Sequence, residues 1–200
     1  RRPARSTVSE VVGDVQRLHQ QAANAGAIYQ VASQFNLLEM VSPRVTPEQG
    51  IGIYERDRTQ GPACAIAAGA GTIYRNYFAP VNGQIGQTSG NQIDCLAELG
   101  LMLDNSGGRL WSMQNGYALA TESGLAEISR RLQEAQADER DRWRQLLRIG
   151  IQWETQVTLG GHSHLVSQAY CSALPVAYSG HASGQWSAFA KLILEAAYEA

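Results

Sequence analysis

Apolar positions along the chain follow a helical spacing in some segments and form β-rich runs in others. In residues 8–22 they have the spacing of a helix: Val8, Val11, Val12, Val15 and Leu18. The β-forming residues that follow Gly26 predict a buried strand over about 27–33, with a turn near Asn36. Proline and glycine interrupt any pattern over 41–61 and predict a long loop, a kind of segment that is usually functional.

The second half of the chain alternates between the two patterns. Helices are predicted over 92–104, from Thr121 to 135, over 138–150 and over the last dozen residues, and β-structure over 110–120, 150–159 and 164–178. Thr121, with a glutamate in the first turn behind it, predicts a capped helix start. This alternation predicts an α/β layer architecture with a largely buried sheet.

The segment PACAIAAGAGTIYRNYF, residues 62–78, predicts a helix with very small side chains. Pro62 suits the first helical position, where its missing N–H costs nothing. The helix is apolar on all faces, so we expect it to be covered on both sides. Its interior glycines, Gly69 and Gly71, each cost about 1 kcal/mol relative to alanine, which indicates that something approaches this backbone closely.

Composition describes an ordinary globular protein. The chain has 200 residues, 44% of them hydrophobic, and a net charge of −2, which predicts a single domain over residues 1–200. No basic patch suggests nucleic acid, and no apolar run is long enough to span a bilayer. Cys64, Cys95 and Cys171 lack any paired spacing, so we expect reduced, buried thiols in a cytoplasmic protein. The missing initial methionine and the helical end suggest a cut from a slightly longer chain, so the ends leave open a secreted effector.

Three segments are candidates for chemistry. A helix N-terminus at Pro62 suits phosphate, and Asp57, Thr59 and Gln60 stand where they would face such a ligand. Polar residues Gln34 to Asn36 follow a predicted strand, and ligands of α/β sheets lie beyond strand carboxyl ends. The strand exit at 170–180, with Ser172 and Tyr178, would form a second phosphate- or ribose-facing loop. Each segment also has a plain structural interpretation: a closely packed core helix, a self-bonded asparagine turn and an ordinary strand exit.

Other chemistry has less support in the sequence. His162 and His164 would share one face of a strand, but no third metal ligand stands nearby, so we expect no metal. Cys171 lacks the local signature of a catalytic nucleophile. The phosphate-binding, esterase and dinucleotide-binding glycine motifs are missing from the sequence, which weighs against kinases, NTPases, esterases and Rossmann enzymes.

The segments QVASQFNLLEMVSP, VTPEQGI, YERDRTQGPACAIAAGAGTIYRNYF, CSALPVAYS and FAKLILEAAYEA together resemble a divergent, MavL-like family of macrodomains. This family is distantly related to the poly(ADP-ribose) glycohydrolase macrodomains and includes a hydrolase that removes ADP-ribose from arginine. The resemblance covers about residues 11–200, and its most specific parts are 34–36 and 57–64. It implies a three-layer α/β/α fold with a mostly buried mixed sheet and an ADP-ribose cleft at one sheet end.

The resemblance also implies the residues of the site. The catalytic carboxylates would be Asp57 first and Glu48 second. The ADP-ribose-binding residues would be Gln34, Phe35, Asn36, Gln49, Thr59, Gln60, Gly61, Gly69, Ser172, Ala173 and Tyr178. Asn36 would hold the distal ribose, and the small residues of helix 62–78 would face the diphosphate. No cofactor is implied, and the partners would be ADP-ribose and an ADP-ribosylated protein.

Hydrolysis of a glycosidic bond to arginine needs a carboxylate that stabilises positive charge at C1″ or activates water. Carboxylates would also hold the guanidinium by paired hydrogen bonds. One departure matters: related sequences carry an acidic residue where Gln49 stands. The sequence therefore leaves three possibilities, namely an ADP-ribosylarginine hydrolase, a module that binds ADP-ribose without turnover, and an α/β domain whose small-residue helix is only packing.

Overall fold

The computed structural model describes residues 7–12, 18, 21–38, 42–50, 52, 73–154, 157–159, 162–164 and 167–200. The elements in chain order are η1 (Ala22–Asn24), β1 (Ile28–Ser33), η2 (Pro47–Gln49), β2 (Pro80–Val81), β3 (Gln84–Ile85), α3 (Ala97–Met102), η4 (Ser106–Gly108), β4 (Trp111–Gln114), β5 (Tyr117–Ala120), α4 (Glu122–Glu134), α5 (Ala137–Leu147), η5 (Arg148–Gly150), β6 (Ile151–Glu154), β7 (Val157–Leu159), β8 (His162–His164), β9 (Ser167–Ser172), α6 (Val176–Ser179) and α7 (Ser183–Glu199). Residues 73–77 are also helical.

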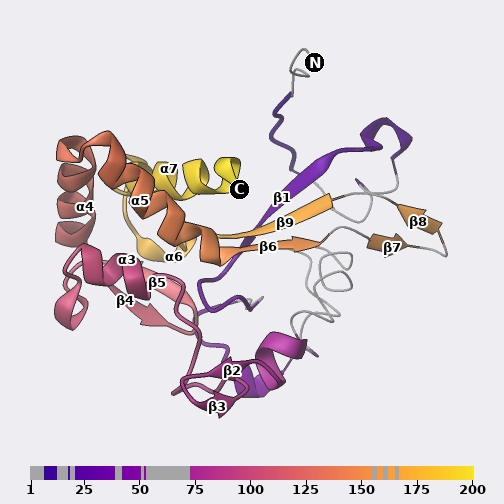
Figure 1. Cartoon of the computed structure of the whole chain (residues 1–200), viewed down its shortest axis with the longest axis horizontal. Helices are drawn as coiled ribbons and strands as arrows, with labels where there is room; N and C mark the ends of the chain where they lie inside the picture. The colour runs from indigo at the N-terminus through magenta and orange to yellow at the C-terminus, as the bar shows by residue number, and fades with distance from the viewer. Residues whose placement is uncertain are drawn as a thin grey trace.

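A three-stranded mixed sheet pairs a strand from the N-terminal part of the chain with two strands from the C-terminal part. Its strand order is β1-β9-β6, with β1 parallel and β6 antiparallel to the central β9. The register places Ser33 beside Ser172, so β1 and β9 end at the same edge of the sheet. Figure 1 shows this sheet reaching away from a helical half formed by α4, α5 and α7.

The helical half contains the main core. Helix α4 begins at a true cap, since the Thr121 hydroxyl accepts a hydrogen bond from the Gly124 N–H at 2.9 Å. Helices α4 and α5 both pack against α7. The buried cluster contains Phe35, Cys95, Leu96, Leu99, Leu103, Leu110, Trp111, Ala118, Leu125, Ile128, Leu132, Trp143, Leu147, Phe189, Leu192, Ile193 and Ala196. Most of the apolar burial therefore lies between helices and the β4–β5 hairpin, and Phe35 connects it to the end of β1.

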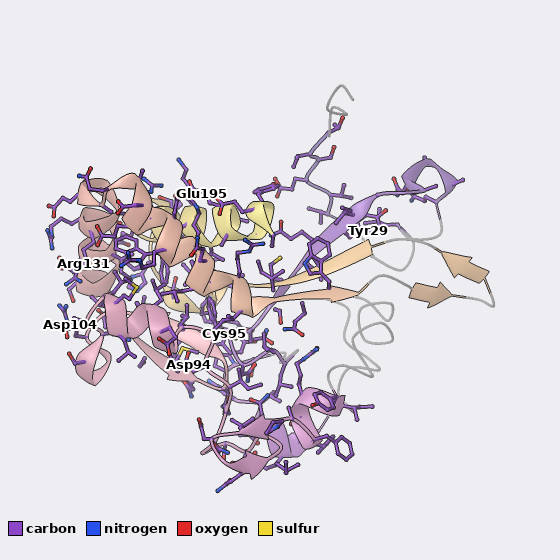
Figure 2. All side chains as sticks on the ribbon, viewed as in Figure 1. Tyr29, Asp94, Cys95, Asp104, Arg131 and Glu195 are labelled. Carbon is purple, nitrogen blue, oxygen red and sulfur yellow. The ribbon has the colours of Figure 1, made fainter. Side chains whose placement is uncertain are left out.

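Ion pairs fasten α7 to α5 at the edge of this core. Arg144 lies 3.2 Å from Glu195 and 2.6 Å from Glu199, and Arg140 lies 3.4 Å from Glu195. Glu195 is labelled on α7 in Figure 2. The carboxylates come from the last turns of α7, so these contacts fix the C-terminal end of the chain.

Two expectations about elements are wrong. Residues 7–12 form neither helix nor strand, and their valines face solvent, with Val12 99% exposed. The spacing of these valines is helical, but no element of the described residues covers them. Leu18, in the later part of the predicted helix, is helical, and residues 13–17 and 19–20 lie outside the described residues. The expected strand over 110–120 is instead the β4–β5 hairpin, which turns at Asn115 and Gly116 with φ of +48° and +81°. An Asn-Gly pair with both φ positive is the favoured two-residue hairpin turn.

The strand predicted over 27–33 is present as β1, but it is less buried than expected. Only Ser33 of this strand is fully buried, because β1 forms an edge of the three-stranded sheet. The helices predicted over 92–104, after Thr121, over 138–150 and at the C-terminus correspond to α3, α4, α5 and α7. The chain is thus an α/β protein with a small mixed sheet. Among the described residues, no helix combines the length and the hydropathy needed to cross a membrane.

Candidate functional site

The carboxyl ends of β1 and β9 bring two of the predicted segments together. Ser33 pairs with Ser172 in the parallel ladder, and the Ala173 N–H donates to the Ser33 carbonyl at 3.0 Å. Residues 34–36 and 172–173 therefore leave the sheet side by side. In α/β sheets, polar groups beyond the carboxyl ends of adjacent strands form the usual ligand site.

Four of the residues predicted to bind ligand are buried at this edge. Phe35 belongs to the main core. The Ser172 hydroxyl lies 2.9 Å from the Gln34 carbonyl and 3.0 Å from the Gly150 carbonyl, so its single proton bonds within the protein. The Gln34 amide reaches the Tyr117 hydroxyl at 3.4 Å. These side chains fix how the two strands leave the sheet.

Asn36 is enclosed on all sides. Its side chain is 0% exposed, and its Oδ1 accepts a hydrogen bond from the Leu38 N–H at 3.0 Å. Its Nδ2 donates to Gln92 Oε1 at 3.1 Å, and its main-chain carbonyl accepts from Gln87 Nε2 at 3.0 Å. In this arrangement no part of the Asn36 side chain is open to a ribose.

The tip of the β4–β5 hairpin closes over Asn36. The Phe35 N–H donates to the Gly116 carbonyl at 2.8 Å, and a Cβ at Gly116 would lie 2.6 Å from Asn36 Nδ2. Asn115 accepts a hydrogen bond from Gln92 Nε2 at 2.9 Å and donates to the Pro43 carbonyl at 2.7 Å. The hairpin turn thus joins the end of β1 to the loop around Pro43.

Glu48, the second predicted catalytic carboxylate, is exposed on η2 and held by a turn from elsewhere in the chain. Its Oε1 accepts hydrogen bonds from the Ser89 N–H at 2.7 Å and the Ser89 hydroxyl at 3.0 Å. The backbone hydrogen bond from Ser89 is the main reason that the pKa of Glu48 falls from 4.5 to about 2. The group is therefore ionised at neutral pH, and among the ion pairs of the described residues none involves it.

A continuous path of hydrogen bonds joins Glu48 to Asn36. Ser89 donates to Glu48, and its carbonyl accepts from Gln92 Nε2 at 3.3 Å. The other end of the Gln92 amide accepts from Asn36 Nδ2. The structure thus connects two residues that the sequence resemblance implied for the same site, although they come from different loops.

Tyr178 and Ala173 lie beyond the end of β9. The Tyr178 ring is 53% exposed and packs edge-on against Tyr117, with centroids 5.6 Å apart and an interplanar angle of 89°. Ala173 is half-buried, and Gln49 on η2 is exposed. Glu48, Gln49, Ala173 and Tyr178 are therefore the predicted site residues that a ligand can reach within the described chain.

The remaining predicted site residues, Asp57, Thr59, Gln60, Gly61 and Gly69, lie outside the described residues. Most of the predicted helix 62–78 lies outside them as well, and its last residues, 73–77, are helical as expected. The placement of the first-choice carboxylate relative to Asn36 and Glu48 thus stays a prediction.

No family model, curated protein or solved structure matches this chain. Membership of the macrodomain family therefore stays a prediction from the sequence resemblance.

Two buried cysteines, Cys95 and Cys171, lie near the site. Burial raises the pKa of Cys95 to about 12 and that of Cys171 to about 11. Both cysteines are free and buried, as predicted, whereas Cys64 lies outside the described residues. Within the described ranges no group of three metal-ligating side chains is present.

A separate cleft of about 540 Å³ lies beside α3. Its lining includes Asp94, before the helix, and Asp104, after it, both labelled in Figure 2. Both carboxylates serve the local backbone fold: Asp94 accepts from the Leu96 N–H at 2.8 Å, and Asp104 pairs with Ser106 and Arg109. These hydrogen bonds of both carboxylates are therefore made to residues close by in the chain.

Four site residues were missed by the sequence analysis: Gln87, Ser89, Gln92 and Tyr117. Three of them come from the loop GQTSGNQ, which carries no recognisable motif. Their partners are 41 to 56 residues away in the chain, so local spacing gave no signal for them.

Proposed function

We propose that this protein is a macrodomain-type ADP-ribosyl hydrolase that cleaves the C1″ glycosidic bond between ADP-ribose and an arginine side chain. The observation that supports this best is the Glu48 carboxylate, ionised and without a cationic partner among the described residues, tied by hydrogen bonds to the end of β1. Under this proposal the α/β fold is a three-layer α/β/α arrangement.

The surroundings of Glu48 favour a cationic substrate. Neutral donors stabilise the anion: Ser89 donates twice to Oε1, and the Thr46 side chain and the Glu48 N–H also lower the pKa of the carboxyl. An arginine guanidinium stays protonated at ordinary pH and forms charge-assisted hydrogen bonds to a carboxylate. Glu48 would therefore bind the guanidinium or stabilise positive charge that develops at C1″.

The low pKa of Glu48 limits which step it can perform. A carboxylate with a pKa of about 2 has no proton to donate at neutral pH and is a weak base. We assign activation of the attacking water to Asp57. In that reaction water adds to C1″, the bond from C1″ to the guanidine nitrogen breaks, and the proton of the water passes to the leaving nitrogen. The products are free ADP-ribose and an arginine guanidinium.

The exposed groups beyond β9 would contact the rest of the ligand. Tyr178 offers an exposed aromatic ring that packs edge-on against Tyr117, and Ala173 is half-buried. Under this proposal Asn36, Gln34 and Ser172 shape the strand ends, and a direct ribose contact by Asn36 requires the Gln92 loop to move.

The test is release of ADP-ribose from a peptide ADP-ribosylated on arginine. We expect the wild-type protein to release it and Asp57→Ala to be slower by about 10²-fold or more, the usual contribution of a general base. Glu48→Gln should lose at least about tenfold in kcat/KM, because it removes one charge-assisted interaction. Glu98→Gln, on the exposed face of α3, is the matched control. Equal rates for the wild type and Asp57→Ala would remove Asp57 from the mechanism.

A second function, binding of ADP-ribose without turnover, is favoured by one feature. Gln49 stands where the resemblance implies an acidic residue, and Glu48 beside it is too weak a base to replace that group. Calorimetry with ADP-ribose beside the turnover assay separates the two functions. Binding without product supports the binding module, and no binding at millimolar ligand contradicts both.

A further inference from the structure

Two glutamines flank a tight turn next to the candidate site. Thr88 and Asn91 close this turn with two backbone hydrogen bonds, of 3.0 Å and 3.1 Å, which leaves Ser89 and Gly90 at its tip. Gln87 precedes the turn and Gln92 follows it. Gln87 holds the main chain of Asn36, whereas Gln92 holds its side chain.

The Gln92 side chain uses both ends of its amide. Its Oε1 accepts from Asn36, and its Nε2 donates to Asn115 Oδ1 at 2.9 Å and to the Ser89 carbonyl at 3.3 Å. Three separate loops therefore meet at this one side chain: the end of β1, the β4–β5 turn and the 88–91 turn.

Ser89 connects Gln92 to the Glu48 carboxylate through hydrogen bonds to both. Its carbonyl faces Gln92, while its N–H and hydroxyl face Glu48. If the 88–91 turn shifts, both donors to Glu48 shift with it, because they belong to the same residue.

We infer that Gln92 is a positioning residue that holds the Glu48 carboxylate at a fixed place relative to Asn36, acting through the Ser89 turn. The coupling between these side chains is a property of the structure, and only its consequence for catalysis rests on the proposed function. A misplacement of a reacting group by about 1 Å can cost about 10²-fold in rate, so such a residue affects turnover without contacting the substrate.

Two substitutions separate the contacts of Gln92. Gln92→Met keeps the length of the side chain and removes all three hydrogen bonds. Gln92→Glu keeps an acceptor for Asn36 but replaces the donor toward Ser89 and Asn115. The matched control is Asn91→Ala, because the Asn91 side chain belongs to the same loop but bonds to Val81, Asn82 and Gln84, away from Asn36.

The main readout is the titration of the Glu48 carboxyl carbon, followed by NMR in the full chain. In Gln92→Met and Gln92→Glu we expect the Glu48 pKa to rise from about 2 toward its ordinary 4.5, and in Asn91→Ala to stay at the wild-type value. The Asn36 side-chain amide signals should move in Gln92→Met and much less in Gln92→Glu. Turnover should fall about tenfold in kcat in both Gln92 variants, with a smaller change in KM.

The outcomes distinguish this inference from the proposed function. An unchanged Glu48 titration in Gln92→Met, or an equal shift in Asn91→Ala, overturns the positioning role. If the wild-type protein releases no ADP-ribose but the titration shifts as expected, the coupling stands and the hydrolase proposal fails. If Gln92→Met does not fold, Gln92→Asn decides through the same Glu48 titration, because it shortens the side chain without adding a charge that would raise the Glu48 pKa by itself.

Discussion

Gly116 lies directly against the buried amide of Asn36. A Cβ atom added to Gly116 would be 2.6 Å from Asn36 Nδ2, too close for any side chain. Gly116 also has a φ of +81°, a conformation that residues with a side chain rarely adopt. The hairpin turn and the end of β1 can therefore approach each other only because residue 116 is glycine.

We expect Gly116→Ala to destabilise the protein and to displace Asn36. The matched control is Gly83→Ala, since Gly83 has a φ of +82° in the β2–β3 turn but has no atom within 4 Å of an added Cβ. Both variants carry the strain of a positive φ, about 1 kcal/mol, and only Gly116→Ala adds the overlap, worth a further 1–3 kcal/mol or so. Urea denaturation of the two variants measures this difference. Equal midpoints would show that Asn36 and the turn do not press on each other.

A second pair of glycines separates packing from helix propensity. An added Cβ at Gly124, in the first turn of α4, would lie 2.7 Å from the Leu110 Cα, whereas at Gly184, in α7, it would meet nothing within 4 Å. We expect Gly124→Ala to lower the free energy of unfolding by about 1–3 kcal/mol through overpacking. Gly184→Ala should raise it by up to about 1 kcal/mol, because alanine is the better helix former. Thermal or urea unfolding of both variants checks the opposite signs, and stabilisation by Gly124→Ala would contradict the packing of α4 on Leu110.

The lowered pKa of Glu48 predicts a pH dependence of the free energy of unfolding. Its pKa in the folded protein, about 2, lies below the ordinary 4.5, so its contribution is present above pH 4.5 and is lost as the pH falls toward 2. Glu48→Gln should be less stable than the wild type near neutral pH by no more than about 1 kcal/mol, because the group is exposed. Urea midpoints at neutral pH and near pH 3 should show this gap shrinking on acidification. A gap that stays constant would indicate that Ser89 does not stabilise the anion.

The buried thiols predict selective protection from alkylation. With a pKa of about 12, Cys95 is a thiolate in only about one molecule in ten thousand at pH 8. Iodoacetamide should therefore leave Cys95 and Cys171 unmodified in the folded protein and modify both in urea. Peptide mass spectrometry measures the labelling at each position, and rapid labelling of Cys95 without denaturant would contradict its burial.

Several elements could be predicted because their signals are local. The Thr121 cap, the helical spacing behind it and the β-rich segments around 30 and 170 depend on neighbours in the chain, and α4, β1 and β9 are where the sequence placed them. The Asn115-Gly116 pair is also a local signal for a turn. The sequence analysis did not use it and therefore predicted one strand where the structure has a hairpin. The valines at 8–12 show the opposite case, because a helical spacing needs a partner surface that the described residues do not supply.

The connections around Asn36 could not be predicted from spacing. Gln92 lies 56 residues from Asn36, and Ser89 lies 41 residues from Glu48. Glutamine and serine in a loop are equally compatible with solvent, so only their contacts give them a role. The predicted exposure of Asn36 to a ligand likewise depended on which loops would cover the end of β1.

The sequence by itself determined the places of α3, α4, α5, α7, β1 and β9, the polar ends of these two strands, and the candidate carboxylates. Its patterns report how each residue relates to near neighbours, and that suffices for local structure. Only the tertiary structure decided that β1 and β9 are parallel neighbours, that Asn36 is enclosed, and that a serine turn holds Glu48 as an anion. These features arise from burial and hydrogen bonds between residues far apart in the chain, which exist only once the chain has folded.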